Sequence, residues 1–384
     1  MTKGPSQLFF ATNADRAALA REQFFEEGQR PSGLVPEPVI QSWSRCMGSR
    51  RKPDERIEFE PISKTRTATV LTKNRRLLEA ARDPLAELEV AIAGSGAVAM
   101  LTNGEGVVVH ASSREPSRSG LMHTVARIGV PIGELAVGTG APGLAASTGE
   151  VAVVRGAEHF FRCMASLHCA AAPIRDASGS VVAVLDLSCV GEPFKFDAAG
   201  MALVYATSIE NRLLADSARS NVLLRFQASP SLIRTPLEGL CAVNGSTGRV
   251  LWFNSAGATL LNFGRVPTRQ ASSEEVFGLN VDALMTLAHK GSAMPRTLPT
   301  GLTVWMAVDY DGREASPEPA LIGTTPPASG CDRIATPTSL KDSNKFAIEE
   351  ALDQCHGNVS KAARLLGVSR GLLYRYLRNQ GRDQ

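Results

Sequence analysis

The stretch that most constrains this chain is HGNVSKAARLLGVSRGLLYRYLRNQG, which occupies residues 356–381. Just before it, the i, i+3, i+4, i+7 spacing of Ile348, Ala351, Leu352 and Cys355 predicts a helix with one apolar face. Asn358 and Ser369 are good N-caps for two further helices, and Gly367 supplies a tight turn between them. Two helices joined by a short glycine turn, the second with a cationic outer face, are typical of a helix-turn-helix.

Positive charge is concentrated in the same segment. The 384-residue chain carries 41 Lys and Arg against 38 Asp and Glu, which is a net charge of +3. From Lys341 to the C-terminus there are eight cations against five acids, which is also a net of +3. Basic charge gathered on one small segment is typical of phosphate binding. The sequence therefore predicts that residues 341–384 bind double-stranded DNA, and a solvated helical hairpin is the alternative.

This segment resembles the Fis-type DNA-binding domain that ends many bacterial enhancer-binding regulators. The shared pattern is Gly-Asn, Lys-Ala-Ala, Leu-Gly-Val-Ser-Arg and Leu-Tyr-Arg-Tyr-Leu. The resemblance implies dimeric binding to a two-fold operator, with the helix that begins at Arg370 in the major groove. The candidate DNA-binding residues are Lys361, Ser369, Arg370, Leu372, Tyr374, Arg375 and Arg378. Leu372 departs from the polar residue often found at its position.

The rest of the chain is long enough for more than one domain. With 43% hydrophobic residues, 384 residues can build two or three cored domains. We find no run of about eighteen apolar residues that could span a bilayer, and no signal-peptide-like run at the N-terminus. The seven cysteines are scattered along the chain, which fits a reducing compartment. These patterns predict a cytoplasmic protein with no membrane partner.

The fold class expected is α+β with several domains. Residues 1–80 predict a helical region, and a longer helix is expected over 67–93, broken near Asp83-Pro84. In residues 81–228, GAVAMLTNGEGVVVHASS predicts a hairpin around a turn at 103–106. Three more strands are expected in EVAVVRG and CAAAPIRDASGSVVAVLDLSC, before an exit helix from Asp197 to about Phe226. This pattern predicts an antiparallel sheet with helices packed on it.

Four motifs in this block resemble the sensor half of acetoin-operon-activator-like bacterial regulators, whose sensor is a GAF domain. They are SWSRC at 42–46, GAEHF at 156–160, CAAAPIRDASG at 169–179 and VLDLSC at 184–189. The resemblance implies a GAF-like domain that binds a small-molecule effector. Candidate ligand-binding residues are His110, His123, Gly138, Thr139, His159, Phe160, Cys169 and Asp186. Gly140 and Pro142 interrupt the polar run that usually follows Gly138-Thr139.

A homodimer is expected, with RNA polymerase or another regulator as a further candidate partner. On the exit helix, Met201, Tyr205, Ile209 and Leu213 recur every four residues and predict an apolar seam. One face of the helix is expected to lie on the sheet, and its C-terminal part to pair with a second protomer. The alternative is a helix packed wholly on its own domain.

Full-length regulators of this type carry an ATPase module between sensor and tail. In GTGAPGLAAST, Gly138 and Gly143 have the spacing of a P-loop, but Leu144 stands where a phosphate-binding lysine is required. No Gly-x-x-x-x-Gly-Lys-Ser/Thr motif occurs in the sequence. The sequence therefore predicts this type of regulator without the ATPase and without a cofactor.

Residues 229–312 resemble the start of a PAS domain. The segment PLEGLCAVNGSTGRVLWFNSAGATLLNF predicts a strand, an Asn-Gly turn, a second strand and a helix capped by Asn254. Trp305 is expected on a later strand. Residues 313–340 predict a Pro/Ser/Thr-rich linker that leads into the helix-turn-helix at 341–384.

Two other functions use the nitrogen and sulfur side chains of the sensor block. His159, Cys163, His168 and Cys169 are close in sequence and suit zinc or iron, although the CxxC pairs of a structural zinc site are absent. On this alternative the chain is a metal- or redox-sensing DNA-binding regulator. A GAF-fold thiol reductase would use Cys163, Cys169 and Cys189, but it leaves the DNA-binding tail unexplained. A regulator with no enzymatic activity is therefore the prediction.

Overall fold

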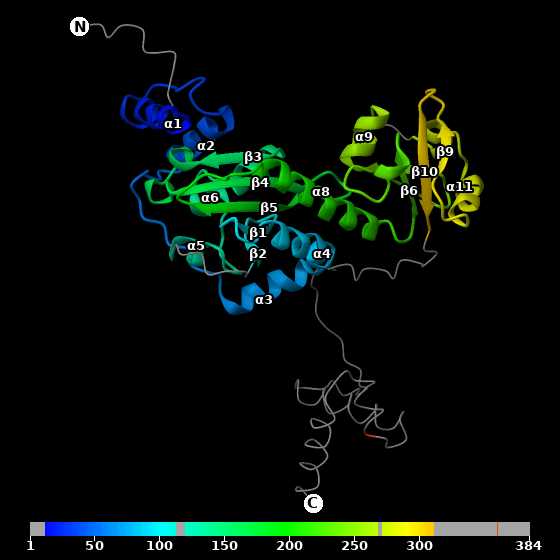
Figure 1. The fold of residues 1–384 in the computed structure, drawn as a ribbon, viewed down its shortest axis with the longest axis horizontal. Helices are drawn as coiled ribbons and strands as arrows, with labels where there is room; N and C mark the ends of the chain where they lie inside the picture. The colour runs from blue at the N-terminus through cyan, green and yellow to red at the C-terminus, as the bar shows by residue number, and fades with distance from the viewer. Residues whose placement is uncertain (1–11, 113–119, 268–270, 311–358, 360–384) are drawn as a thin grey trace, which may run out of the picture. The chain divides into compact units, whose positions relative to one another are not determined.

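The structure, a computed structural model, describes residues 12–112, 120–267, 271–310 and 359. The chain divides into two compact units, Met1–Ser316 and Pro317–Gln384. The predicted linker and all the predicted DNA-binding residues, from Lys361 to Arg378, lie outside the described residues. In the first unit, two five-stranded antiparallel sheets carry helices on their faces (Figure 1). The expected α+β class is therefore confirmed.

The N-terminal part is helical, as predicted. It contains α1 (Asn13–Arg21), a π-helical turn η1 (Glu22–Glu26), α2 (Glu37–Gly48), α3 (Lys64–Lys73) and α4 (Arg75–Ala91). The predicted break near Pro84 is wrong, because α3 and α4 separate at Asn74 while Pro84 is buried inside α4. A proline inside a helix costs about 3 kcal/mol. The apolar face of α4 outweighs this cost by burying Leu77, Leu85 and Leu88, at about 1.5–3 kcal/mol for each large side chain.

The first sheet has the strand order β2-β1-β5-β4-β3. Its strands are β1 (Val98–Asn103), β2 (Val108–Ala111), β3 (Ala152–Arg155), β4 (Leu167–Arg175) and β5 (Val181–Val190). The predicted hairpin is confirmed, since β1 and β2 pair antiparallel and the Gly106 N–H donates to the Asn103 carbonyl at 2.9 Å. The predicted turn between β4 and β5 is also present, with the Gly179 N–H 3.0 Å from the Asp176 carbonyl.

Each face of the first sheet has its own core, because side chains alternate along a strand. Leu101, Ala172 and Leu187 face α4 and α8 (Ala198–Ser217), which run alongside each other (Figure 1). Met100, Cys169 and Val184 face the opposite way, toward the core that includes α2. That second face is covered by α5 (Gly120–Val125), α6 (Glu134–Val137), α7 (Ala141–Thr148), η2 (Gly156–Glu158) and η3 (Arg162–Met164).

The exit helix is shorter than predicted. Helix α8 ends at Ser217, and Val222–Gln227 forms strand β6, so the prediction of a helix to about Phe226 is wrong. The physical reason is the alternation of Val222, Leu224 and Phe226, which places three apolar side chains on one face of the second sheet. The predicted seam is partly covered within the chain: Ile209 is buried in the core between α8, α4 and the sheet, and the half-buried Met201, Tyr205 and Leu213 pack against that core.

The second sheet has the strand order β8-β7-β6-β10-β9. Its other strands are β7 (Gly239–Val243), β8 (Val250–Phe253), β9 (Met294–Thr297) and β10 (Thr303–Asp309). The remaining helices are η4 (Pro230–Leu232), α9 (Ser255–Leu261), α10 (Ser273–Phe277) and α11 (Val281–Ala288). The predicted cap of α9 is confirmed, because Asn254 Oδ1 accepts from the Gly257 N–H at 2.8 Å, and Trp305 lies on β10 as predicted.

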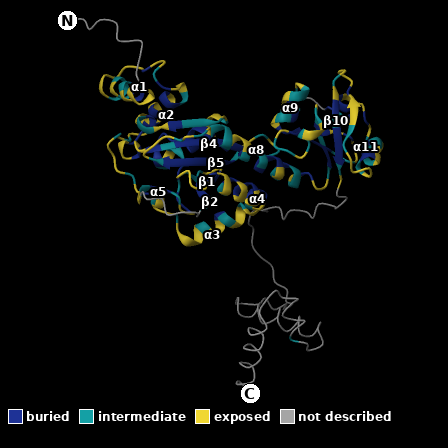
Figure 2. Cartoon of the chain, in the orientation of Figure 1, coloured by how far each residue is buried: buried dark blue, intermediate teal, exposed yellow. Residues whose placement is uncertain are grey.

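Helix α8 belongs to the cores of both sheets. Its N-terminal part buries Ala202, Ala206 and Ile209 against the first sheet. Its C-terminal part buries Leu214 with Trp252 and other residues on the outer face of the second sheet. Figure 2 shows β4, β5 and β10 as largely buried, whereas the edge strand β9 has no buried residue. Among the described residues, no helix has the length and apolar character needed to cross a bilayer.

Candidate functional site

A line of polar side chains crosses the apolar face of the first sheet that α2 helps to cover. Asp186 and Ser188 are two residues apart on β5, so their side chains share a face of the sheet. On the neighbouring strand β4, Cys169 lies directly opposite Ser188. His159 lies directly after η2 and is also buried. We refer to Asp186, Ser188, Cys169 and His159 as the relay.

Hydrogen bonds connect the four side chains of the relay. The Ser188 hydroxyl lies 2.6 Å from Asp186 Oδ2 and 3.0 Å from Cys169 Sγ, and Cys169 Sγ lies 3.5 Å from His159 Nε2. His159 Nδ1 is 3.0 Å from the Gly156 carbonyl oxygen. A carbonyl oxygen can only accept, so a neutral His159 donates from Nδ1, and its Nε2 accepts from the Cys169 thiol.

Burial disfavours the charged forms of His159, Cys169 and Asp186. It lowers the pKa of His159 to about 4 and raises the pKa of the Cys169 thiol well above its usual range. Burial also raises the pKa of Asp186 to about 7, against the opposing effect of the Ser188 hydrogen bond. Asp186 Oδ1 is buried and has no hydrogen-bond partner among the described residues. Among the described residues, this oxygen is therefore an acceptor that no donor uses.

The N-terminal helices hold the segment that carries His159 and Phe160. The Trp43 indole N–H of α2 donates to the Glu158 carbonyl at 2.8 Å. The Arg21 guanidinium donates to the carbonyls of Ala157, His159 and Phe160 at 3.1, 2.5 and 3.1 Å. It also lies over the Phe25 and Trp43 rings, and its burial lowers the Arg21 pKa to about 10. We call α1, η1 and α2 the N-terminal cover.

A second contact joins α2 to the segment at Gly138-Thr139. The Ser42 hydroxyl is 2.7 Å from Thr139 Oγ1 and donates to Glu134 Oε2 at 2.8 Å. Arg45 binds the same carboxylate through two N–H groups, at 2.6 and 2.7 Å. Gly138 has a φ of 64°, and a Cβ added there would lie 3.0 Å from Phe160 and Phe161. The SWSRC motif thus fixes the segment that packs on Phe160.

The structure brings together some of the predicted ligand-binding residues and not others. His159, Cys169 and Asp186 form the relay with Ser188, and Gly138, Thr139 and Phe160 lie in the segments that the N-terminal cover holds. His110 instead bonds Glu89 of α4 at 3.0 Å, on the other face of the sheet. His123 is exposed on α5 and is apart from the relay.

The four predicted metal or redox candidates do not converge. Cys163 is exposed in η3, and His168 Nε2 lies 3.2 Å from the Gly191 carbonyl, so only His159 and Cys169 contact each other. In the part of the chain that the structure describes, no three His, Cys, Asp or Glu side chains lie close enough to hold a metal ion. Burial also raises the pKa of Cys189 to about 11, which disfavours the thiolate that redox chemistry needs.

Comparison with known families covers both ends of the chain. Residues 11–212 match the family described as MimR, N-terminal domain, which is more than half of the 384 residues. The chain belongs to this family. The match includes the N-terminal cover and the whole relay. Residues 339–378 match the family described as bacterial regulatory protein, Fis family, so the predicted Fis-type helix-turn-helix is confirmed as a family assignment.

Two relatives carry the names of regulators. The acetoin catabolism regulatory protein of Cupriavidus necator is 30% identical over 234 residues, which cover 59% of this chain and 35% of that protein. The propane 2-monooxygenase operon transcriptional activator MimR of Mycolicibacterium smegmatis is 30% identical over 203 residues, which cover 51% of this chain and 33% of that protein. The chain thus spans about a third of the length of these relatives. The predicted kinship with acetoin-operon-activator-like regulators is confirmed.

Among solved structures, the chain is similar to the E. coli DhaR(N)–DhaL complex. The TM-score is 0.45 at 15% sequence identity, and the alignment covers 72% of this chain and 99% of that chain.

Proposed function

We propose that this chain is a transcription regulator that binds DNA through residues 341–384 and a small-molecule effector through the first sheet. The observation that carries the proposal is the combination of two family matches, one for the N-terminal domain of MimR and one for the Fis family. The concentration of the net positive charge in residues 341–384 supports DNA as the partner. We propose regulation rather than catalysis for the same reasons.

We assign the first sheet and its helices to a GAF-like sensor domain, and the second sheet to a PAS-like domain. Because β6 pairs with β7 and β10, residues 222–227 group with the PAS-like domain, ahead of the boundary at 229 expected from the sequence. We further propose a homodimer on a two-fold operator, since that is how Fis-type domains bind. The seam on α8 is partly occupied within the chain, so we propose the dimer contact for residues 341–384.

The relay supports an effector site in the GAF-like domain. A buried acceptor without a partner costs about 1–3 kcal/mol, and Asp186 Oδ1 is such an acceptor. An effector that donates a hydrogen bond to this oxygen would remove the cost. The N-terminal cover and the segment at Gly138-Thr139 enclose the same face of the sheet, so the effector would contact them as well.

DNA binding should depend on the recognition helix. We expect Arg370→Ala and Arg375→Ala each to weaken binding to DNA that the full chain selects from a random pool. Loss of a base contact costs about 1–3 kcal/mol and relaxes sequence preference, whereas loss of a phosphate contact flattens the salt dependence by about one unit. Fluorescence anisotropy at several salt concentrations measures both. Arg56→Ala, an exposed arginine of the N-terminal region, is the control, and unchanged affinity in both tail variants would contradict the proposal.

The pH dependence of stability should report the ionisation of Asp186. Its pKa is raised from 3.8 to about 7 in the folded chain, so folding favours the protonated acid. The cost of the buried carboxylate is therefore absent below pH 4, grows between pH 4 and pH 7, and is complete above that range. The stability of Asp186→Asn minus that of the wild type should therefore increase by about 2–3 kcal/mol as the pH is raised from 5 to 8. Urea denaturation of both proteins at pH 5 and at pH 8 measures this change. A stability difference that is the same at the two pH values would contradict the raised pKa of Asp186.

His159 titrates in the opposite direction and must be separated from Asp186. Its pKa is lowered to about 4, so the stability it contributes is lost as the pH falls from about 6.5 toward 4. Comparing wild type with Asp186→Asn at each pH cancels this contribution, because His159 is present in both proteins.

We propose that the chain acts without an ATPase of its own. Residues 213–338, between the two family matches, contain no Gly-x-x-x-x-Gly-Lys-Ser/Thr motif. Without such a loop and its lysine, the β and γ phosphates have no cradle. We expect ATP turnover by the purified chain to equal that of a heat-inactivated sample. Turnover that survives further purification and follows the protein peak would contradict this.

A further inference from the structure

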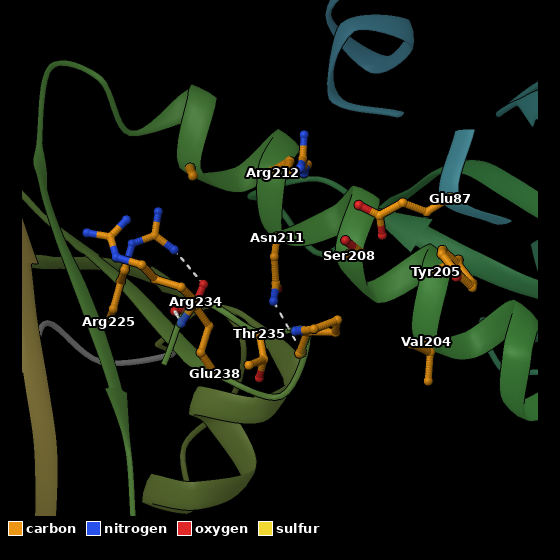
Figure 3. A pocket seen from close by; sticks show the side chains of 12 residues that line it. Glu87, Val204, Tyr205, Ser208, Asn211, Arg212, Arg225, Arg234, Thr235 and Glu238 are labelled. Atoms are coloured by element: carbon orange, nitrogen blue, oxygen red, sulfur yellow. Dashed lines mark hydrogen bonds and ion pairs between the residues drawn. The ribbon is translucent and has the colours of Figure 1, made fainter. Parts of the chain in front are cut away.

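A cavity of about 410 Å³ lies between α8 and the segment that follows η4 (Figure 3). Its lining consists of Glu87 of α4, residues Val204, Tyr205, Ser208, Asn211, Arg212 and Ala215 of α8, and Arg225, Arg234, Thr235, Pro236 and Glu238. Helix α8 packs on the face of the first sheet opposite the relay. The cavity is thus separate from the proposed effector site, and its volume suits a small molecule.

One end of the cavity presents two arginines that carboxylates hold in place. Arg225 pairs with the buried Glu238 and, through Nε at 2.6 Å, with Asp309. Arg234 Nη2 lies 3.2 Å from Asp309, and the Arg234 backbone N–H donates to Glu238 Oε2 at 2.7 Å. A guanidinium has five N–H donors, so both side chains keep donors for a further acceptor.

The backbone of Arg234 is also unusual. Its φ is 63°, in the left-handed region that residues other than glycine adopt only at a cost. The hydrogen bond from its N–H to Glu238 helps to hold this conformation. Such strain is found preferentially where a side chain must be placed for function. Here it places the guanidinium at the edge of the cavity (Figure 3).

The other end of the cavity presents acceptors from α4 and α8. Glu87, Tyr205 and Ser208 have no hydrogen-bond or ion-pair partner among the described residues. Glu87 extends from α4 toward the cavity in Figure 3. Arg212 also lines the cavity, but its guanidinium pairs with Asp83 at 2.6 Å and not with Glu87.

We propose that this cavity binds a small zwitterion, such as a free amino acid. Its carboxylate would bind the remaining donors of Arg225 and Arg234, and its ammonium group would bind Glu87, with Ser208 and Tyr205 as further acceptors. A simple anion would bind the arginines but would be repelled by Glu87. A simple cation would bind Glu87 but would be repelled by Arg225 and Arg234. Only a molecule that carries both charges satisfies both ends.

A ligand in this cavity would stabilise the junction between α8 and the second sheet. The acceptors come from α4 and α8, which cover the first sheet, while the arginines belong to β6 and the segment after η4. A ligand that binds only when α8 and the second sheet are arranged to form the cavity increases the population of that arrangement by mass action. The cavity therefore gives the chain a second input, independent of the effector at Asp186.

Isothermal titration of the full chain with free amino acids tests the proposal, with N-acetylated amino acids and amino-acid amides as matched ligands. We expect heat of binding only from free amino acids, which carry both charges, and not from the N-acetylated forms or the amides, which carry one. Glu87→Gln and Arg234→Gln should each weaken binding roughly ten-fold or more, because each removes a charge-assisted contact. Glu60→Gln and Arg56→Gln, which change exposed side chains away from the cavity, should bind as the wild type does.

The competing results are distinct. No heat from any of the twenty amino acids at about 10 mM would overturn the proposal. Equal binding of N-acetylated forms would show a site for anions only, and equal binding of the amides a site for cations only; either overturns it. Unchanged affinity in Glu87→Gln would place the ligand elsewhere. Circular dichroism melts of each variant establish that a loss of binding is not a loss of folding.

Discussion

Replacing Trp43 by alanine should destabilise the chain by about 3–5 kcal/mol, the usual cost of removing a buried aromatic side chain. Trp43 is fully buried, and its ring packs against Phe24 and Phe25 at centroid distances of 5.4 and 5.0 Å. The substitution also removes the hydrogen bond to the Glu158 carbonyl, which lies in the segment that carries His159. Urea denaturation followed by circular dichroism measures the change in the free energy of unfolding.

Leu135→Ala is the matched control for this substitution. Leu135 lies on α6, and its side chain is 90% exposed, so its loss should change stability by less than about 0.5 kcal/mol. If Trp43→Ala were no more destabilising than Leu135→Ala, the N-terminal cover would not be part of the folded sensor. Amide hydrogen exchange at 156–161 should also become faster in Trp43→Ala, because the segment loses a contact that holds it and opens more often.

The strands and turns of the first sheet could be predicted because local signals determine them. The Asn103-Gly104 turn and the Asp176 to Gly179 turn separate runs of β-branched and apolar residues, and the structure has a hairpin at each. The errors came where tertiary packing outweighs a local signal. Pro84 would end an isolated helix, but the packed face of α4 retains it. The end of α8 was missed because Val222, Leu223 and Phe226 also fit one face of a continuing helix, and only the pairing with β7 and β10 decides for a strand.

The site was predicted in part, for similar reasons. His159, Cys169 and Asp186 stand out in the sequence as polar or reactive residues in or beside apolar strands. Ser188 could have been added, because a residue two positions from Asp186 on a strand shares its face. Arg21 and Glu134 could not, because Arg21 is 138 residues from His159 and Glu134 is 92 residues from Ser42. Sequence periodicity carries no information on contacts between segments so far apart.

The largest effect at the junction of the two sheets is expected from Arg265. Glu210 of α8 accepts from the Arg175 N–H of β4 at 2.7 Å and from Arg265 Nη2 at 2.6 Å. The side chains of Glu210 and Arg265 are 6% and 19% exposed. Removing one partner of a buried ion pair leaves the other charge uncompensated, at a cost of about 3–5 kcal/mol. We expect a loss of this size in Arg265→Met, measured by urea denaturation.

Two further variants show whether the loss comes from the stranded carboxylate. Glu210→Gln in the Arg265→Met background should recover part of the stability, because it removes the unpaired charge and keeps an acceptor for the Arg175 N–H. Arg212→Met breaks a pair on the same helix whose side chains are 45% and 54% exposed, and it should have little effect. If Arg265→Met cost no more than Arg212→Met, Glu210 would have to be solvated in solution. The two sheets would then be joined through the apolar contacts of Leu214 and Trp252 and the hydrogen bonds of Asn211 to Asn254 and Pro236.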